Sequence, residues 1–212
     1  YITNEGERSM ATCLGASCSL SNEHIDEDYF SKSKFVYIEG YLFDLPNQEE
    51  IFAKIAMFSE KHQCKIILGL SDRHCVKRHY DRYNNFIKHH VDILFSNEQE
   101  LNALMKTNHP EQAIKSCYNL CPLTIVTHGA KGAMVISKST VKHINAISVD
   151  KIQDKNGAGD FFAAGFIYAL TKPDRFDMLE AGNLASKTAA YILKKSGARP
   201  QDDFKATILS GI

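Results

Sequence analysis

The chain has 212 residues, of which 44% are hydrophobic and 24% charged, a composition typical of a globular domain with at most a small appendage. Its 25 basic and 25 acidic residues cancel, and it has no long basic run, which argues against nucleic acid or an anionic membrane surface as partner. No apolar stretch approaches the roughly 18 residues of a membrane span. The chain starts at Tyr1 rather than Met, so we expect that its natural start is missing.

The sequence contains six cysteines but no C-x-x-C pair, which argues against a zinc knuckle. We expect reduced thiols in a cytoplasmic protein, with a disulfide framework as the alternative. Cys64 opens an apolar run and is expected to be buried. The six are Cys13, Cys18, Cys64, Cys75, Cys117 and Cys121.

Short β-branched runs alternate with stretches of helical periodicity. This order predicts a mostly parallel sheet with helices on both faces, and ligands beyond the carboxyl ends of its strands. Ser96 is a candidate cap for the helix that follows it. The loops to search come after Leu70, Phe95, Thr127 and Val149. In chain order we expect a strand at 34–40, a helix at 47–62, a strand at 64–70, a helix at 72–90, a strand at 91–95, helices at 97–105 and 110–119, strands at 123–129 and 132–137, and helices at 158–171 and 176–195.

The stretch GERSMATCLGAS, residues 6–17, stands outside this alternation. Met10, Thr12 and Leu14 alternate with smaller residues, a weak period of two that predicts a half-covered strand. We expect this strand to belong to a flap or a small separate sheet.

The stretch DKNGAGDFFAAGF, residues 154–166, combines a glycine loop with the start of an apolar helix. Glycines allow the backbone to approach a ligand closely, and the free N–H groups of a helix start favour a phosphate or another anion. Asp160 in the first turn is either a charge that compensates the helix dipole or a general base that takes a proton from a substrate hydroxyl.

Two other nucleotide-binding loops do not fit the spacing. A Rossmann G-x-G-x-x-G loop would need glycine where the chain has Phe162. A Walker loop needs a second glycine before its lysine, and the nearest approach, between Gly129 and Lys138, lacks it.

The 154–160 stretch resembles the C-terminal signature of the ribokinase-like (PfkB) sugar and nucleoside kinases, Asp-Thr-x-Gly-Ala-Gly-Asp. Lys155 replaces the usual threonine, which puts the loop's phosphate contacts and the activity itself in question. Three more stretches and the ending GARP (197–200) match the family in order: NEQE (97–100), THGAKG (127–132) and AGNLAS (181–186).

This resemblance implies an α/β, three-layer α/β/α ribokinase-like fold with a mostly parallel sheet and the remnant of a small β lid. Residues 1–20 would be part of the lid, and 21–212 the nucleotide-binding and catalytic core. The match corresponds to the later two-thirds of the family. The fragment alone is therefore expected to be poorly active.

The implied function is an ATP-dependent phosphotransferase that acts on a primary hydroxyl of a nucleoside or sugar, as a monomer or homodimer. In this mechanism Asp160 is the base, and the amides of Gly157, Ala158 and Gly159 hold the transferred phosphoryl group. Asn97 and Glu100 organise Mg²⁺ through water, although the residues alone suit a helix cap and an exposed first-turn acid equally well. The expected nucleotide-binding residues are Asn97, Glu100, Thr127, Gly129, Gly132 and Asn183.

Several assignments stay open. Asp154 is either part of a monovalent cation site, with K⁺ as a third cofactor, or a hydrogen-bond acceptor that tightens its loop. His128 is expected to be solvated, and Phe162, Phe166 and Tyr168 to belong to the core. The amino-acid sequence of these motifs is most similar to that of adenosine kinases. Fructokinase-like and ribokinase-like sugar kinases, and a non-catalytic nucleotide- or sugar-binding protein on the same fold, are the alternatives.

Overall fold

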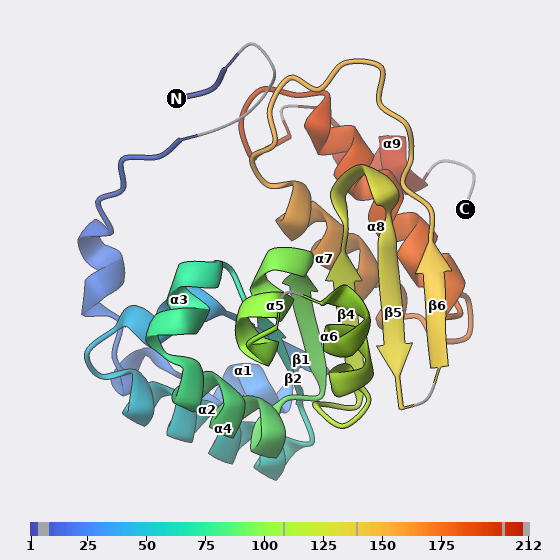
Figure 1. The fold of residues 1–212 in the computed structure, drawn as a ribbon. Coiled ribbons are helices and arrows are strands. Elements are labelled where there is room, and N and C mark those ends of the chain that lie inside the picture. Colours follow the sequence, from blue (N-terminus) through green and yellow to red (C-terminus); the bar gives the residue numbers. More distant parts are fainter. Residues whose placement is uncertain (4–8, 108, 139, 201, 210–212) are drawn as a thin grey trace. The chain divides into compact units, whose positions relative to one another are not determined.

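The computed structural model describes residues 1–3, 9–107, 109–138, 140–200 and 202–209 (Figure 1). Its strands form one sheet in the order β1-β2-β3-β4-β5-β6. The first four strands pair in parallel. The connections from β4 to β5 and from β5 to β6 are too short for a parallel crossover, and Figure 1 shows β5 running opposite to both neighbours. The predicted α/β fold with a mostly parallel sheet is therefore confirmed.

The elements follow the expected order closely. The strands are β1 (Phe35–Glu39), β2 (Lys65–Gly69), β3 (Ile93–Asn97), β4 (Leu123–Thr127), β5 (Ala133–Ser137) and β6 (Thr140–Ile144). The α-helices are α1 (Glu27–Ser31), α2 (Gln48–His62), α3 (Arg73–Arg78), α4 (Tyr80–His90), α5 (Glu98–Met105), α6 (Pro110–Cys117), α7 (Ala158–Leu170), α8 (Met178–Leu193) and α9 (Phe204–Leu209). Short 3-10 helices are η1 (Gly15–Ser19), η2 (Asn22–His24), η3 (Gly40–Asp44) and η4 (Gly129–Lys131).

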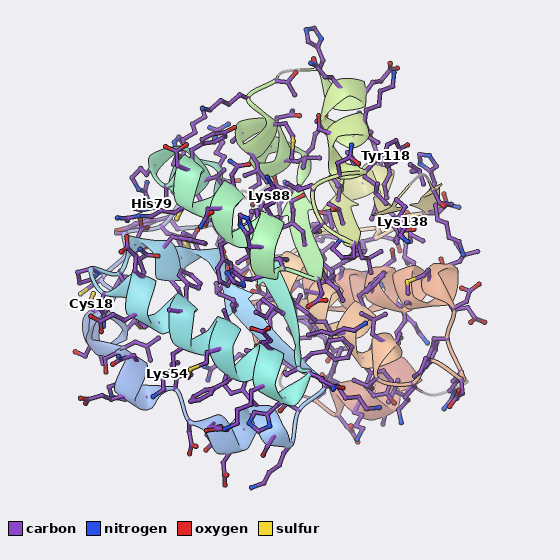
Figure 2. All side chains as sticks on the ribbon, turned by 90° about the horizontal axis from the view of Figure 1, so that it is seen from below. Cys18, Lys54, His79, Lys88, Tyr118 and Lys138 are labelled. Atoms are coloured by element: carbon purple, nitrogen blue, oxygen red, sulfur yellow. The ribbon has the colours of Figure 1, made fainter. Side chains whose placement is uncertain are left out.

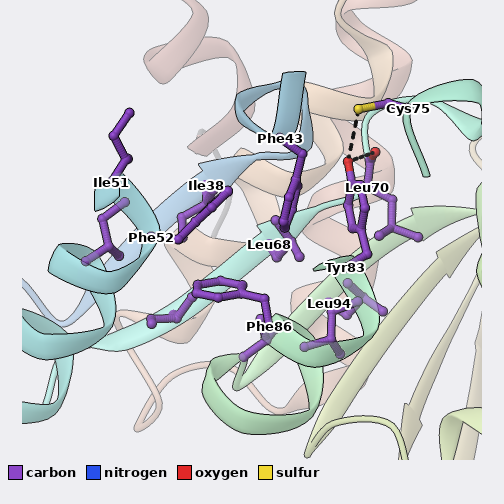
Figure 3. Close-up of a cluster of buried hydrophobic side chains, with 14 of the residues drawn as sticks. Ile38, Phe43, Ile51, Phe52, Leu68, Leu70, Cys75, Tyr83, Phe86 and Leu94 are labelled. Atoms are coloured by element: carbon purple, nitrogen blue, oxygen red, sulfur yellow. Dashed lines mark hydrogen bonds between the residues drawn. The ribbon is translucent and has the colours of Figure 1, made fainter. Parts of the chain in front are cut away.

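One face of strands β1 to β3 carries the main hydrophobic core (Figure 3). Ile38, Leu68 and Leu94 lie opposite one another in register on neighbouring strands, so their side chains share this face. Helices α2 and α4 contribute Phe52 and Phe86, whose ring centroids are 4.7 Å apart. Burial of these aliphatic and aromatic surfaces positions the ends of the strands from which the loops emerge.

A buried tyrosine ties the ends of β1 and β2 together. The hydroxyl of Tyr83 on α4 lies 2.9 Å from the carbonyl oxygen of Gly40 and 3.2 Å from that of Leu70. It also lies 3.5 Å from Sγ of Cys75 (Figure 3). Gly40 is required here, because an added Cβ would come within 2.4 Å of the Tyr83 hydroxyl.

The long helix predicted over 72–90 is wrong in one respect, because it divides into α3 and α4 at His79. His79 leaves the helical region, with φ −116° and ψ 28°, and its Nε2 lies 2.7 Å from Oδ1 of Asp44. Arg78 donates to the same carboxylate at 2.7 Å. This ion-pair cluster with Asp44 accompanies the break.

Two further expectations are corrected by local structure. The cap of α5 is Asn97 rather than Ser96, since the Asn97 side chain accepts the Glu100 amide. Strand β6 was not predicted, because three of its five residues are exposed and it buries only Ile144 in full. The core assignments hold for Phe162 and Phe166, whereas Tyr168 is half-buried.

The strand expected in residues 6–17 is absent from the part that the structure describes. Residues 6–8 lie outside the described residues, 9–14 have no regular structure, and 15–17 begin η1. Tyr1 and Ser9 exchange two backbone hydrogen bonds of 2.9 Å, which is an antiparallel pairing. The assignment of residues 1–20 to a lid stays a prediction.

The chain forms two compact units. One comprises Cys13–Thr127 and Val135–Val141, and the other comprises Tyr1–Thr12, His128–Met134 and Lys142–Ile212. None of the six cysteines is in a disulfide, and Cys64 is buried as predicted. Over the described residues, every helix is too short or too polar to span a bilayer.

Candidate active site

The glycine loop before α7 has a backbone that only glycine adopts easily. Gly157 is the N-cap of α7, in the left-handed region with φ 77°. A Cβ at this position would also meet Cβ of Ala198 at 3.1 Å. Gly159 differs, since a Cβ there would meet nothing within 4 Å, so its neighbourhood is open. Gly157 is buried and the Ala158 amide donates to the carbonyl oxygen of Lys155 at 3.4 Å, so the exposed part of the loop is at Gly159.

Asp160 is the third residue of α7 and its side chain is exposed. At this position a carboxylate interacts favourably with the positive end of the helix dipole. It also stands beside the amides of the glycine loop, where a hydroxyl and a phosphoryl group could meet. Both interpretations of Asp160 fit its place in the fold.

Asp154 is almost fully buried and holds the glycine loop closed. Its Oδ1 accepts the amide of Asn156 at 2.8 Å, and its Oδ2 accepts the amide of Gly197 at 2.9 Å. The second bond joins the loop to the GARP segment, which is 43 residues away in the sequence. These contacts favour the loop-tightening alternative, and the K⁺ site stays a prediction.

In the other unit, Asn97 and Glu100 form a reciprocal cap at the start of α5. The Glu100 amide donates to Oδ1 of Asn97, and the Asn97 amide donates to Oε2 of Glu100, both at 2.9 Å. Nδ2 of Asn97 donates to Oε1 of Glu100 at 2.6 Å. Asn97 is exposed, but Glu100 is buried, so the alternative of an exposed first-turn acid is wrong for Glu100.

The pKa of Glu100 is raised to about 7, chiefly by burial and also by the charges of Asp72 and Glu39, while the hydrogen bonds from Asn97 oppose the rise. Glu39 ends β1, and Asp72 follows β2. Neither acid is part of a motif in the sequence, although Asp72 lies in the loop after Leu70, where a ligand was expected. A divalent cation suits this chemistry, because oxygen ligands are what Mg²⁺ prefers and its charge would relieve the repulsion.

Thr127 lies next to Asn97, since the two are paired residues at the ends of β4 and β3. Its hydroxyl donates to the carbonyl oxygen of Ser96 at 3.4 Å, a long hydrogen bond. Within this unit the structure thus brings together three of the predicted nucleotide-binding residues, Asn97, Glu100 and Thr127.

The remaining predicted nucleotide-binding residues lie in the unit that contains the glycine loop. Gly132, with φ 92°, closes a tight turn in which the His128 amide donates to its carbonyl oxygen at 2.8 Å. A Cβ on Gly132 would come within 2.0 Å of the carbonyl oxygen of Ile144, so glycine is required for packing alone. Gly129 begins this turn and Asn183 is exposed on α8. His128 is half-buried rather than solvated.

Comparison with known proteins identifies the protein family to which the chain is similar. A family model described as the pfkB family of carbohydrate kinases matches residues 1–204. The 5-dehydro-2-deoxygluconokinase of Bacillus subtilis (strain 168) is 23% identical over 186 residues, which are 85% of this chain and 57% of that protein.

Two solved structures share the ribokinase-like α/β fold. The adenosine kinase from Sinorhizobium meliloti has a TM-score of 0.94 and is 30% identical to this chain. The match covers 100% of this chain and 64% of the adenosine kinase chain. A putative ribokinase II from E. coli in complex with ATP and Mg²⁺ has a TM-score of 0.76 and is 22% identical to this chain. The match covers 85% of this chain and 58% of the ribokinase chain. The chain therefore spans less than two thirds of the length of these similar proteins.

Proposed function

The chain belongs to the pfkB family of carbohydrate kinases, and on that premise we propose that it carries the base and phosphate-binding loop of an ATP-dependent kinase for a primary hydroxyl of a nucleoside or sugar. The observation that carries this proposal is the exposed carboxylate of Asp160 in the first turn of α7, directly after the left-handed Gly157. Because the chain spans only 57% to 64% of two of its similar proteins, the activity is proposed for the full-length protein.

Asp160 accepts the proton of the substrate hydroxyl as that oxygen attacks phosphorus. An ionised carboxylate within hydrogen-bond reach of the hydroxyl is sufficient for this role. Exposure of the side chain gives a substrate access to it. Asp154, by contrast, is buried and uses both oxygens on backbone amides, so it shapes the loop rather than taking the proton.

The amides of Gly157, Ala158 and Gly159 stabilise the negative charge on the transferred phosphoryl group. Their donors are fixed by the helix start and by the Asp154 contacts before any ligand binds, so little reorganisation is needed during the reaction. The missing side chain at Gly159 leaves the approach to this end of the helix open, since a Cβ there would meet nothing within 4 Å.

ATP supplies the phosphoryl group, and Mg²⁺ neutralises charge on its phosphates when both are bound. We assign Asn97 and Glu100 to hold the water shell of Mg²⁺. Near pH 7 the Glu100 carboxyl is partly protonated, and a neighbouring cation favours its ionised form. We assign Thr127, Gly129, Gly132 and Asn183 to the nucleotide.

An adenosine-like nucleoside is the preferred acceptor. The resemblance of the motifs and the 30% identity to the Sinorhizobium meliloti adenosine kinase support it. The relative from Bacillus subtilis is named for a sugar acid, which favours a sugar acceptor instead. ADP release by the full-length protein with adenosine, ribose, fructose and 5-dehydro-2-deoxygluconate separates these acceptors.

The test of the mechanism is Asp160→Asn in the full-length protein. We expect turnover to fall by about 10²–10⁴-fold while ATP still binds, because the amide cannot accept the proton. The control is Glu180→Gln, since Glu180 is the acid at the same third position of α8. It should retain turnover. Retained turnover in Asp160→Asn would reduce Asp160 to a dipole-compensating charge and end the proposal.

A further inference from the structure

Helices α3 and α5 present matching polar faces around a pocket that the kinase proposal does not use. Arg73 and Lys77 are one turn apart on α3, and Tyr80 follows at the start of α4. Across from them, Gln99, Asn102 and Lys106 recur at helical spacing on α5 and its C-cap. These side chains line a pocket with a volume of about 350 Å³. That volume suits a small molecule.

The lining of this pocket is strongly cationic. It contains three positive side chains, Arg73, Lys77 and Lys106, and no acid. Nζ of Lys106 lies 3.4 Å from the centroid of the Tyr80 ring, and Nη1 of Arg73 donates to Oε1 of Gln99 at 3.1 Å. Neither contact neutralises a charge.

The three cations of the pocket are exposed, and two of them are close on the same helix. Arg73 and Lys77 are like charges four residues apart, which repel one another on a helix. An anion between α3 and α5 would remove the repulsion.

The donor types point to phosphate. A guanidinium group pairs with two phosphate oxygens at once, and ammonium groups add point charges around the same anion. The neutral amides of Gln99 and Asn102 line the same pocket and would hydrogen-bond to the rest of a small molecule. We propose that this pocket binds a small molecule through a phosphate or pyrophosphate group, held by Arg73, Lys77 and Lys106. The proposal does not depend on the kinase reaction.

The probe is inorganic pyrophosphate, titrated at low ionic strength into the full-length protein with dimethylated, ¹³C-labelled lysines. We expect the NMR signals of Lys77 and Lys106 to shift on binding. The double variant Lys77→Gln/Lys106→Gln should bind at this site at least tenfold more weakly. The matched control is Lys88→Gln, an exposed lysine on α4 (Figure 2), which should bind as the wild type does.

The outcome distinguishes the source of the phosphate. If ADP shifts the same two signals at a lower concentration than pyrophosphate does, the ligand is a nucleotide. If pyrophosphate binds more tightly than ADP, the phosphate group alone is recognised. Either result supports the proposal. Pyrophosphate that leaves both signals unmoved overturns it, as does equal affinity for citrate or unchanged binding in the double variant. Loss of kinase turnover in any variant does not bear on it, because the readout is binding at two named lysines.

Discussion

Glu100 has the most perturbed environment among the proposed site residues. The residue is 7% exposed, and its carboxyl accepts two hydrogen bonds from Asn97 and has a pKa of about 7. Burial is the largest cause, and Asp72 and Glu39 add to it. A carboxyl in this state is ready to change its protonation when a cation approaches.

The raised pKa of Glu100 predicts a pH-dependent stability. In the unfolded chain this group ionises near 4.5, whereas in the folded protein it does so near 7. Its contribution is therefore fully present below pH 4.5 and is lost as pH rises through 7. The pKa differs by about 2.5 units between the unfolded and the folded chain, and each unit corresponds to about 1.36 kcal/mol. The free energy of unfolding should therefore fall by about 3 kcal/mol over this pH range. Urea unfolding between pH 4 and 8 measures it.

Glu100→Gln isolates this contribution. The amide cannot ionise, so we expect the free energy of unfolding to lose this decline between pH 4.5 and 7. Glu111→Gln on α6, where the acid is exposed, should retain the decline of the wild type. A Glu100→Gln protein with the wild-type pH dependence would show that the Glu100 carboxyl is not perturbed in this way.

The sequence predicted Asn97 and Glu100 as a pair but not what surrounds them. An Asn-x-x-Glu spacing at a helix start is sufficient to predict a capping interaction. The burial of Glu100 and the charges of Glu39 and Asp72 depend on residues that come from other strand ends. Their approach is set by the parallel register of β1, β2 and β3, which a local pattern does not contain.

At the scale of elements, helices α7 and α8 pack with almost no space between them. A Cβ on Gly165 would lie 2.5 Å from Oγ1 of Thr188 and 3.0 Å from Cα of Ala185. Oγ1 of Thr188 in turn donates to the carbonyl oxygen of Phe161 at 2.6 Å. This close approach fixes the direction of α7, and therefore of the helix start that carries Asp160.

Gly165→Ala is expected to destabilise the protein by about 1–3 kcal/mol, because the added methyl group overpacks the contact between the two helices. Thermal or urea unfolding measures the loss. Gly159→Ala is the control for stability, since its methyl group meets nothing within 4 Å in the same helix. Addition of Thr188→Ala should recover part of the loss in Gly165→Ala. An unchanged free energy of unfolding in Gly165→Ala would contradict the packing.

For the whole molecule, the reactivity of the six thiols measures which parts of the chain are buried in the native state. Cys13 and Cys18 are exposed, whereas Cys64, Cys75 and Cys117 are buried. Burial raises the pKa of Cys117 to about 12 and raises the pKa of Cys64 and of Cys75. Thiolate is the reactive form, so buried thiols should be inert in the native state.

Cys121 is half-buried, and burial raises the pKa of its thiol as well. Titration with a thiol reagent near neutral pH should therefore find two fast thiols, Cys13 and Cys18, in the native protein and all six after unfolding. The double variant Cys13→Ser/Cys18→Ser should have no fast thiol. Fewer than six thiols in denaturant without reductant, restored by reductant, would reveal a disulfide and contradict the reduced state.

The alternation of strands and helices, the mostly parallel sheet and the family could all be predicted from the sequence. These depend on local periodicity, glycine spacing and motif order, which are written along the chain. The sequence did not determine the break at His79, strand β6, or the absence of regular structure in residues 9–14. Tertiary structure decided these, together with the burial of Glu100, the contacts of Asp154 and the cationic pocket. Each depends on groups distant in sequence, and only the packed fold brings such groups within hydrogen-bond or Coulomb range.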